Sequence, residues 1–237
     1  MTHPAARPLI AILALWPLAM CLLVVACSAR AQDKKDFSPA ERLLFMTNQL
    51  AALKPPTTLN YSFRKSGSME EGFEDKVKIA LSKQPDGSCC AGVGEFLTGT
   101  RTLKLAEVPA AEGNPVILYF LEHDVREMQR LTKGSQYHFR KRIRMAVYQG
   151  ANVREVSLAY RGKTIQGTQV DISPYLDDPN RPRYEKLAVK QYQFLLSNAV
   201  PGGVYGIRTH IGEASQAPLI VEELYAEGAE PARKTTP

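Results

Sequence analysis

The fold is decided by the stretch between Leu187 and Tyr225, which reads LAVKQYQFLLSNAVPGGVYGIRTHIGEASQAPLIVEELY. It contains three runs of aliphatic, aromatic and β-branched residues, a composition that favours strands: Leu187–Leu196, Val204–Ile211 and Leu219–Tyr225. Connections this short join antiparallel neighbours, because a parallel crossover needs about a dozen residues or more. We therefore predict an antiparallel meander, with a β-bulge near Lys190 and Gln191, where the apolar parity changes.

The alternation of apolar and polar residues extends through much of the preceding chain. Leu59, Tyr61 and Phe63 alternate with polar side chains, as expected of a strand with one buried face. Further strands are predicted at Phe73–Ser82, Val93–Leu105, Ser135–Tyr148, Val156–Tyr160 and Thr164–Ile172. The longest of them is Ser135–Tyr148, which places Tyr137, Phe139, Ile143, Met145 and Val147 on one face.

Two segments have helical signals instead. Ser38, Pro39 and Glu41 form a capping box with proline at the first helical position, and apolar residues then recur at helical spacing as far as Leu53. Asn114 and Pro115 open a second helix, which Gly134 is expected to close as a left-handed cap. Its apolar stripe consists of Ile117, Leu118, Leu121, Val125, Met128 and Leu131.

These elements predict an α+β fold. Short connections make the sheet antiparallel, and about nine or ten strands are too many for a flat sheet. The sheet should therefore curve strongly into an unclosed half-barrel, with the two helices covering its concave face. We expect a single domain over residues 32–228 and a disordered tail over residues 229–237.

The N-terminus resembles an export signal. A short basic region containing Arg7 precedes an apolar run from Leu9 to Ala26, and small residues follow. A membrane anchor is the alternative, since the run approaches spanning length, but Pro17 and the small residues favour cleavage. Ala29-Arg30-Ala31 fits ordinary signal peptidase, so residues 1–31 are expected to be removed. Val24-Val25-Ala26-Cys27 resembles a lipoprotein box, which would instead leave Cys27 lipidated. We expect a soluble periplasmic protein, or an outer-membrane lipoprotein facing the periplasm if Cys27 is lipidated.

No catalytic motif is present, because the sequence contains no HExxH, CxxC, GxSxG, Walker A or Rossmann fingerprint. Asp171, Asp177 and Asp178 suggest a glycosidase carboxylate pair, but the last two lie in a Pro-rich segment typical of a loop. His123 with Cys89 and Cys90 could supply zinc ligands, although the spacing matches no zinc motif. We expect a protein that is not an enzyme and holds no metal or cofactor.

A row of cations on the predicted strand Ser135–Tyr148 is the sharpest surface feature. Alternate residues of a strand share a face, so the row would project together toward solvent: His138, Arg140, Arg142 and Arg144. Outside the cytoplasm the anionic partner would be a membrane surface rather than nucleic acid. A solvated strand face, or pairing with acids across the sheet, is the alternative.

Cys89 and Cys90 are the cysteines that remain once the signal region is removed. A disulfide between neighbours is geometrically strained, and it would be either a redox or ligand-sensing bond or merely a local tie. An unpaired couple in a Gly-rich loop is the third interpretation.

The order of elements resembles the LolA/LolB family of periplasmic lipoprotein carriers. The resemblance rests on the signal, the opening helix, Leu59–Phe63 as first strand, the helix before Gly134 and the closing strands up to Tyr225. It implies an acyl chain, lipid or lipidated protein bound in the half-barrel, without enzymatic activity. The candidate lining residues, taken from the second helix and the strand expected beneath it, are Leu118, Leu121, Val125, Phe139, Ile143 and Met145. A docking or assembly factor of the envelope is the alternative, and an envelope enzyme with an unrecognised site is the third.

Processing can be tested directly. We expect the exported protein to begin at Gln32, because Ala29-Arg30-Ala31 fits signal peptidase better than the imperfect lipoprotein box. Intact-mass analysis measures this, and the Cys27→Ala variant should be exported with the same mature mass. Diacylglycerol on Cys27 would contradict the prediction.

Overall fold

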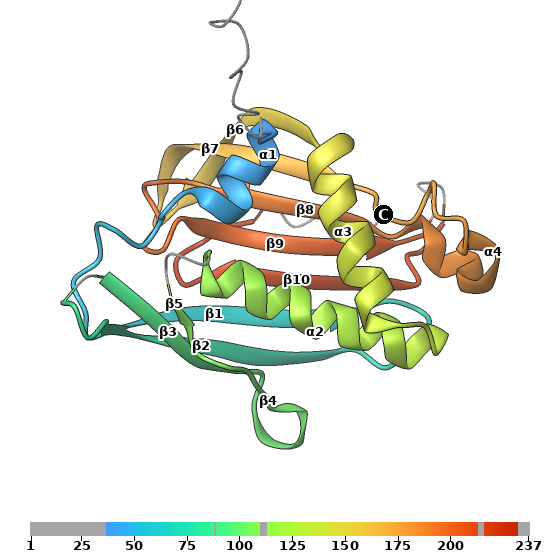
Figure 1. Ribbon diagram of the computed structural model, residues 1–237, viewed down its shortest axis with the longest axis horizontal. Coiled ribbons are helices and arrows are strands. Elements are labelled where there is room, and N and C mark those ends of the chain that lie inside the picture. The colour runs from blue at the N-terminus through green and yellow to red at the C-terminus, as the bar shows by residue number, and fades with distance from the viewer. Residues whose placement is uncertain (1–36, 88, 110–112, 213–215, 232–237) are drawn as a thin grey trace, which may run out of the picture. The chain divides into compact units, whose positions relative to one another are not determined.

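A computed structural model describes residues 37–87, 89–109, 113–212 and 216–231 of the chain (Figure 1). The export signal, including Cys27 and the expected cleavage sites, lies outside the described residues. Among the described residues, none of the helices is long and apolar enough to cross a membrane.

The described strands form one antiparallel sheet (Figure 1). Its order is β4-β3-β2-β1-β10-β9-β8-β7-β6, with β5 paired to β3, so the first long strand lies beside the last. The edge strands β4 and β6 do not pair with each other, which leaves the sheet unclosed and confirms the predicted α+β class. The strands are β1 (Thr57–Ser66), β2 (Phe73–Lys83), β3 (Cys89–Phe96), β4 (Leu103–Lys104), β5 (Val108–Pro109), β6 (Asn152–Tyr160), β7 (Lys163–Ile172), β8 (Gln191–Leu196), β9 (Val204–Ile211) and β10 (Ile220–Ala226).

Helices cover one face of this sheet: α2 runs along the strands, α3 continues from it at a steep angle across β9 and β8, and α1 lies next to α3 (Figure 1). The core lies between them, where rings such as Phe63, Phe120 and Phe194 are almost inaccessible to water. The helical elements are α1 (Pro39–Glu41), α2 (Pro115–Thr132), α3 (Gln136–Gln149) and α4 (Arg181–Tyr184), together with the π-helical turn η2 (Arg42–Met46) and the 3₁₀ segments η3 (Gly99–Arg101) and η5 (Glu185–Val189).

α2 begins and ends as predicted, at Pro115 and Thr132, but its left-handed cap is not the expected glycine. The side chain of Asn114 accepts a hydrogen bond from the Val116 amide, and Pro115 follows it. Lys133, not Gly134, takes the left-handed conformation, with φ of 59°. Gly134 is needed for another reason, because a Cβ there would lie 2.6 Å from the ring of Phe139. This close approach sets the tight turn from α2 into α3.

The predicted strand Ser135–Tyr148 is wrong, because this segment is the helix α3. Its buried residues are Phe139, Ile143 and Val147, each four positions from the next. Residues four apart share a face in a strand and nearly share one in a helix, so the pattern fits both structures. Tyr137 distinguishes them: the strand would bury it, yet its side chain is 75 % exposed.

The start of the predicted strand Leu187–Leu196 is also wrong. η5 covers residues 185–189 and β8 begins at Gln191. The parity change at Lys190 therefore marks the junction of two elements, and the register shift in this strand lies between Leu195 and Leu196 instead.

The first helix is shorter than the apolar spacing suggested. Its capping box is present, with Ser38 and Glu41 hydrogen-bonded to each other's backbone amides. The helical conformation ends at Met46, because the Asn48 side chain accepts a hydrogen bond from the Leu50 amide and turns the chain.

The predicted tail begins too early. Ala229 forms a β-bridge with Tyr160, and the Glu230 amide donates to the Ala159 carbonyl oxygen at 3.0 Å. These residues therefore belong to the folded unit, and residues 232–237 lie outside the described residues.

Candidate functional site

The inward side of α2 is not uniformly apolar. Val116, Ile117 and Phe120 in its first half are fully buried, as expected of a helix covered on several sides. In its second half, His123, Asp124 and Glu127 turn toward the sheet together with apolar Val125 and Met128. The concave face of the sheet therefore meets charged groups as well as apolar ones.

Asp124 is the centre of a buried polar cluster. Its carboxylate accepts hydrogen bonds from the ammonium group of Lys190 and from the hydroxyl of Tyr192. The side chains of Asp124 and Lys190 are 0 % and 2 % exposed. The Tyr192 hydroxyl also lies 3.1 Å from that of Tyr175, which is equally buried. A helix residue is thus linked to the start of β8 by groups that water does not reach.

Glu222 of β10 extends the same cluster. One carboxylate oxygen lies 3.7 Å from the Lys190 Nζ atom and accepts from the Thr209 hydroxyl at 3.4 Å. The other lies 3.4 Å from the His123 Nε2 atom, and the His123 ring stacks on Phe96 with ring centres 4.8 Å apart. Within the described part of the chain, no buried side-chain nitrogen or oxygen atom lacks a hydrogen-bond partner.

The pKa values of the cluster reflect a competition between burial and pairing. Burial disfavours the charged form of Lys190, but the charges of Asp124 and Glu222 outweigh it and raise its pKa. Burial likewise opposes the ionisation of Glu222, yet Lys190 and His123 lower its pKa to about 2. For Asp124, burial prevails over the attraction of Lys190 and raises the pKa. Lys190 is therefore the cation that makes two buried carboxylates tolerable.

A more exposed network adjoins the cluster. Lys65 of β1 donates to Glu127 at 3.0 Å and to Glu70, in the β1–β2 connection, at 2.7 Å. Arg130 of α2 also contacts both of these glutamates. His123, Asp124, Glu127 and Arg130 thus tie the C-terminal half of α2 to β10, to the start of β8, to β1 and to the β1–β2 connection.

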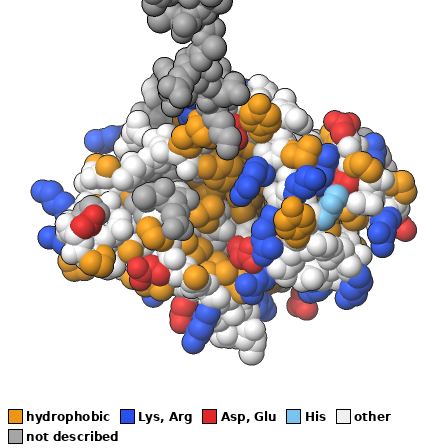
Figure 2. All heavy atoms as spheres, in the orientation of Figure 1, with side chains coloured by type: hydrophobic (Ala, Val, Ile, Leu, Met, Phe, Trp, Pro, Cys, Tyr) orange, Lys and Arg blue, Asp and Glu red, His pale blue; other side chains and the backbone are white. Residues whose placement is uncertain are grey.

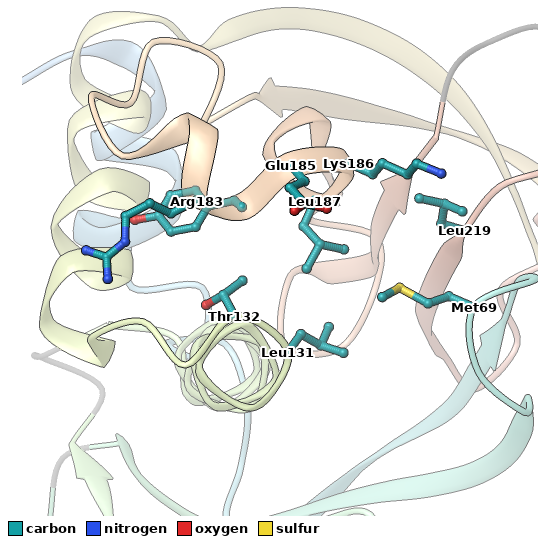
Figure 3. Close-up of a pocket in the computed structure, with 9 residues that line it drawn as sticks. Met69, Leu131, Thr132, Arg183, Glu185, Lys186, Leu187 and Leu219 are labelled. Atoms are coloured by element: carbon teal, nitrogen blue, oxygen red, sulfur yellow. The ribbon is translucent and has the colours of Figure 1, made fainter.

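A cavity of about 390 Å³ lies at the C-terminal end of α2 (Figure 3). Figure 3 shows Leu131, Leu187 and Met69 pointing toward one another around it, whereas the charged ends of Arg183 and Lys186 point away. Its size is near the lower end of the roughly 300–1,000 Å³ that is typical of ligand pockets. The lining residues are Met69, Leu131, Thr132, Arg183, Tyr184, Glu185, Lys186, Leu187 and Leu219.

None of the lining residues predicted from sequence borders this cavity. Leu121, Val125, Phe139 and Ile143 are packed in the core, and Leu118 and Met145 are half-buried. The sequence pattern predicts that these residues face one another from a helix and a strand beneath it. In the structure they lie on the two neighbouring helices α2 and α3. The cavity residues come from four separate segments of the chain, and no sequence pattern connects them.

The predicted cationic row is wrong, because residues two apart on a helix point about 200° apart. His138 pairs with Asp178 at 2.6 Å, and Arg142 donates to the Pro174 carbonyl oxygen at 3.0 Å. Arg140 contacts Glu122 at 2.8 Å, so of the four cations Arg144 alone makes no such contact with a described residue. Asp178 is buried and accepts a hydrogen bond from the Asn180 amide in the loop before α4.

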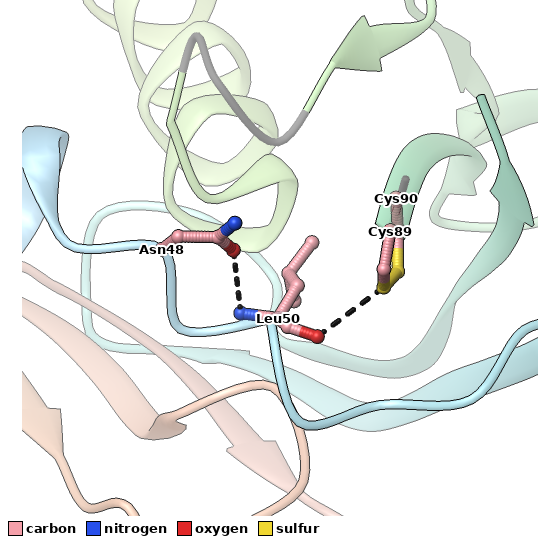
Figure 4. The surroundings of a disulfide bond; sticks show 4 residues. All are labelled: Asn48, Leu50, Cys89 and Cys90. Atoms are coloured by element: carbon pink, nitrogen blue, oxygen red, sulfur yellow. Dashed lines mark hydrogen bonds between the residues drawn. A yellow bond between two sulfur atoms is a disulfide. The ribbon is translucent and has the colours of Figure 1, made fainter. Parts of the chain in front are cut away.

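Cys89 and Cys90 are joined by a disulfide at the start of β3 (Figure 4). Cys90 is fully buried, and the Cys89 sulfur lies 3.3 Å from the Leu50 carbonyl oxygen. The pair thus packs against the segment that follows η2. Among the described residues, no group of three or more His, Cys, Asp or Glu side chains is arranged to hold a metal.

The importance of Lys190 can be measured by urea denaturation. Lys190→Met leaves two buried carboxylates without their cation, and we expect a loss of roughly 3–5 kcal/mol in the free energy of unfolding at pH 7. The exposed neighbour provides a matched control, because Lys186→Met should change stability by less than about 0.5 kcal/mol.

The pH dependence of that loss follows from the pKa shifts. In the wild type, the lowered pKa of Glu222 contributes stability at neutral pH that disappears as the pH falls from its unfolded value toward about 2. Without Lys190, burial raises the pKa of both carboxyls, so the variant gains relative stability as they protonate. The deficit should shrink between pH 7 and pH 5, and a deficit independent of pH would contradict this account.

No protein-family model and no curated protein matches this sequence. Among solved structures, the chain is similar to the Mycobacterium tuberculosis lipoprotein LppX, with 11% sequence identity and a TM-score of 0.34. The match covers 78% of this chain and 92% of LppX. A likeness this weak supports no conclusion about the ligand or activity of this chain.

Proposed function

We propose that this protein is a non-enzymatic envelope protein that binds a hydrophobic ligand, namely a lipid, an acyl chain or a lipidated protein, between α2 and the sheet. The observation that carries the proposal is the cavity at the C-terminal end of α2. The N-terminal sequence, which resembles an export signal, supports a location of the protein outside the cytoplasm, either soluble or anchored through Cys27.

The cavity suits one end of an amphipathic molecule. Leu131, Leu187 and Leu219 provide an apolar wall, and the side chain of Met69 at the rim is 47 % exposed, so water reaches the opening. Arg183 and Lys186 also line it, and their charged ends point outward (Figure 3), where a head group that stays in water would meet them. An apolar chain that ends in a carboxylate or phosphate would satisfy both features.

The polar cluster limits how far such a chain can enter. Asp124 lies two turns of α2 before Leu131, about 10 Å along the helix at 1.5 Å per residue. An apolar chain inserted between Asp124 and Lys190 would leave both buried charges without a partner, which is energetically costly. Deeper binding therefore requires α2 to move and water or polar ligand groups to solvate the exposed charges.

A docking or assembly factor is the second candidate. Its support is the exposed outer face of α3, although that face fits a lipid bilayer better than a protein surface. A protein of that kind should bind partners normally when the cavity is filled.

Ligand binding can be tested with the purified mature protein. Native mass spectrometry should show a retained lipid, and a fluorescent fatty acid should bind the delipidated protein. Leu131→Trp or Met69→Trp should fill the cavity and weaken fatty-acid binding at least tenfold. Leu176→Trp is the matched control, because Leu176 is 38 % exposed and outside the cavity. Absence of lipid from the wild type, together with unchanged binding in the filled variants, would overturn the proposal.

The two outward-pointing cations predict the class of head group. Arg183→Gln combined with Lys186→Gln should weaken binding of a fatty acid severalfold, while binding of the fatty alcohol of equal length should stay unchanged. Competition against the fluorescent probe measures both. Equal losses for acid and alcohol would show that the two cations do not recognise the ligand's charge.

A further inference from the structure

The outer face of α3 carries a straight stripe of aromatic and cationic side chains. Tyr137, Lys141, Arg144 and Tyr148, which we call the α3 stripe, are spaced four, three and four residues apart. At 100° per residue they lie within about 60° of one another around the helix, along a length of roughly 16 Å. They therefore face in one direction.

That direction is toward solvent. Tyr137 and Tyr148 are 75 % and 54 % exposed, more than any other large hydrophobic side chain in the described part of the chain. The opposite side of α3, formed by Phe139, Ile143 and Val147, is packed in the core. Burying two tyrosine rings would normally stabilise the protein, so their exposure at both ends of one stripe needs an explanation.

The two cations of the stripe are not used by the fold. Arg140 and Arg142 pair with Glu122 and Asp178, whereas Lys141 and Arg144 make no hydrogen bond or ion pair with another described residue. α3 itself contains no acidic residue. Figure 2 shows Lys and Arg side chains gathered over this part of the surface.

We infer that the α3 stripe docks the protein onto an anionic lipid bilayer. Tyrosine rings favour the level of the lipid head groups, where the ring is half-buried and the hydroxyl stays wet. Lys and Arg extend their charges to lipid phosphates on apolar stems. Each cation near an anionic surface strengthens binding about fivefold.

A protein partner fits the stripe less well. A stable protein interface needs about 800 Å² from each partner, and four side chains in a row cover much less. A bilayer needs no shape complementarity, because its head groups adapt to a straight row of ring and charge.

This inference goes beyond ligand binding and does not depend on it. It also places the cavity near the bilayer. Leu131 and Thr132 line the cavity, and only the turn at residues 133–135 separates α2 from α3. A docked α3 would hold the cavity close to the membrane surface from which a lipid could be taken.

Vesicle co-sedimentation tests the docking. The mature chain should bind phosphatidylcholine vesicles that contain about one third phosphatidylglycerol and should not bind pure phosphatidylcholine. Lys141→Gln combined with Arg144→Gln should weaken binding about 25-fold at low salt, and the difference should shrink as salt is raised. Tyr137→Ser combined with Tyr148→Ser should also weaken it, with no change in circular dichroism.

The matched control changes the net charge equally at another place. Lys76 and Lys78 are exposed neighbours on one face of β2, and Lys76→Gln with Lys78→Gln should leave vesicle binding within twofold of wild type. Equal losses in the two charge variants, or no preference for anionic vesicles, would overturn the inference. The cavity-filling variant Leu131→Trp should bind vesicles normally, so a failure of docking and a failure of ligand binding can be told apart.

Discussion

The contact on which the rest of the structure depends is the buried pairing of Lys190 with Asp124 and Glu222. A lone ammonium group out of water costs several kcal/mol, so Lys190 is tolerated only where both carboxylates reach it. One carboxylate lies on α2 and the other on β10, and Lys190 lies at the start of β8. Because the three charges must meet, the rotation of α2 about its axis and its position along the sheet are both set.

This constraint changes how the concave face can be used. A half-barrel that binds a lipid along its whole length needs a continuous apolar surface, and the cluster interrupts it. Apolar space remains at the C-terminal end of α2, where Leu131 meets Leu187 and Leu219. Arg183 and Lys186 also line this space, with their charged ends turned outward. The buried charges therefore hold α2 against the sheet, and the C-terminal end of the same helix leaves room for a ligand.

α3 divides its cations between two roles. Arg140 and Arg142 point back toward Glu122 and Asp178 and fix the helix against α2 and the loop before α4. Lys141 and Arg144 point away, between two exposed tyrosines. The division rests on helical geometry and on one ion pair, because Arg142 points about 160° away from Arg144, whereas Arg140 lies only about 40° from Arg144 and is engaged by Glu122. It could not exist on the strand that the sequence pattern suggested, where Arg140, Arg142 and Arg144 would have shared one face.

Local chemistry was readable from the sequence by itself: the capping box at Ser38, the cap at Asn114, the antiparallel meander and the α+β class all depend on residues close together in the chain. The helical conformation of residues 135–148 could not be read from the sequence, because apolar residues four apart fit both a strand and a helix. The partners of Lys190 could not be read from the sequence either, although the break in apolar parity at Lys190 was a visible sign of an irregular position. Asp124 and Glu222 are 66 and 32 residues from Lys190 in the chain, and nothing local specifies which buried charges meet. Only the tertiary structure decides this, because the energy of a buried charge depends on what surrounds it in space.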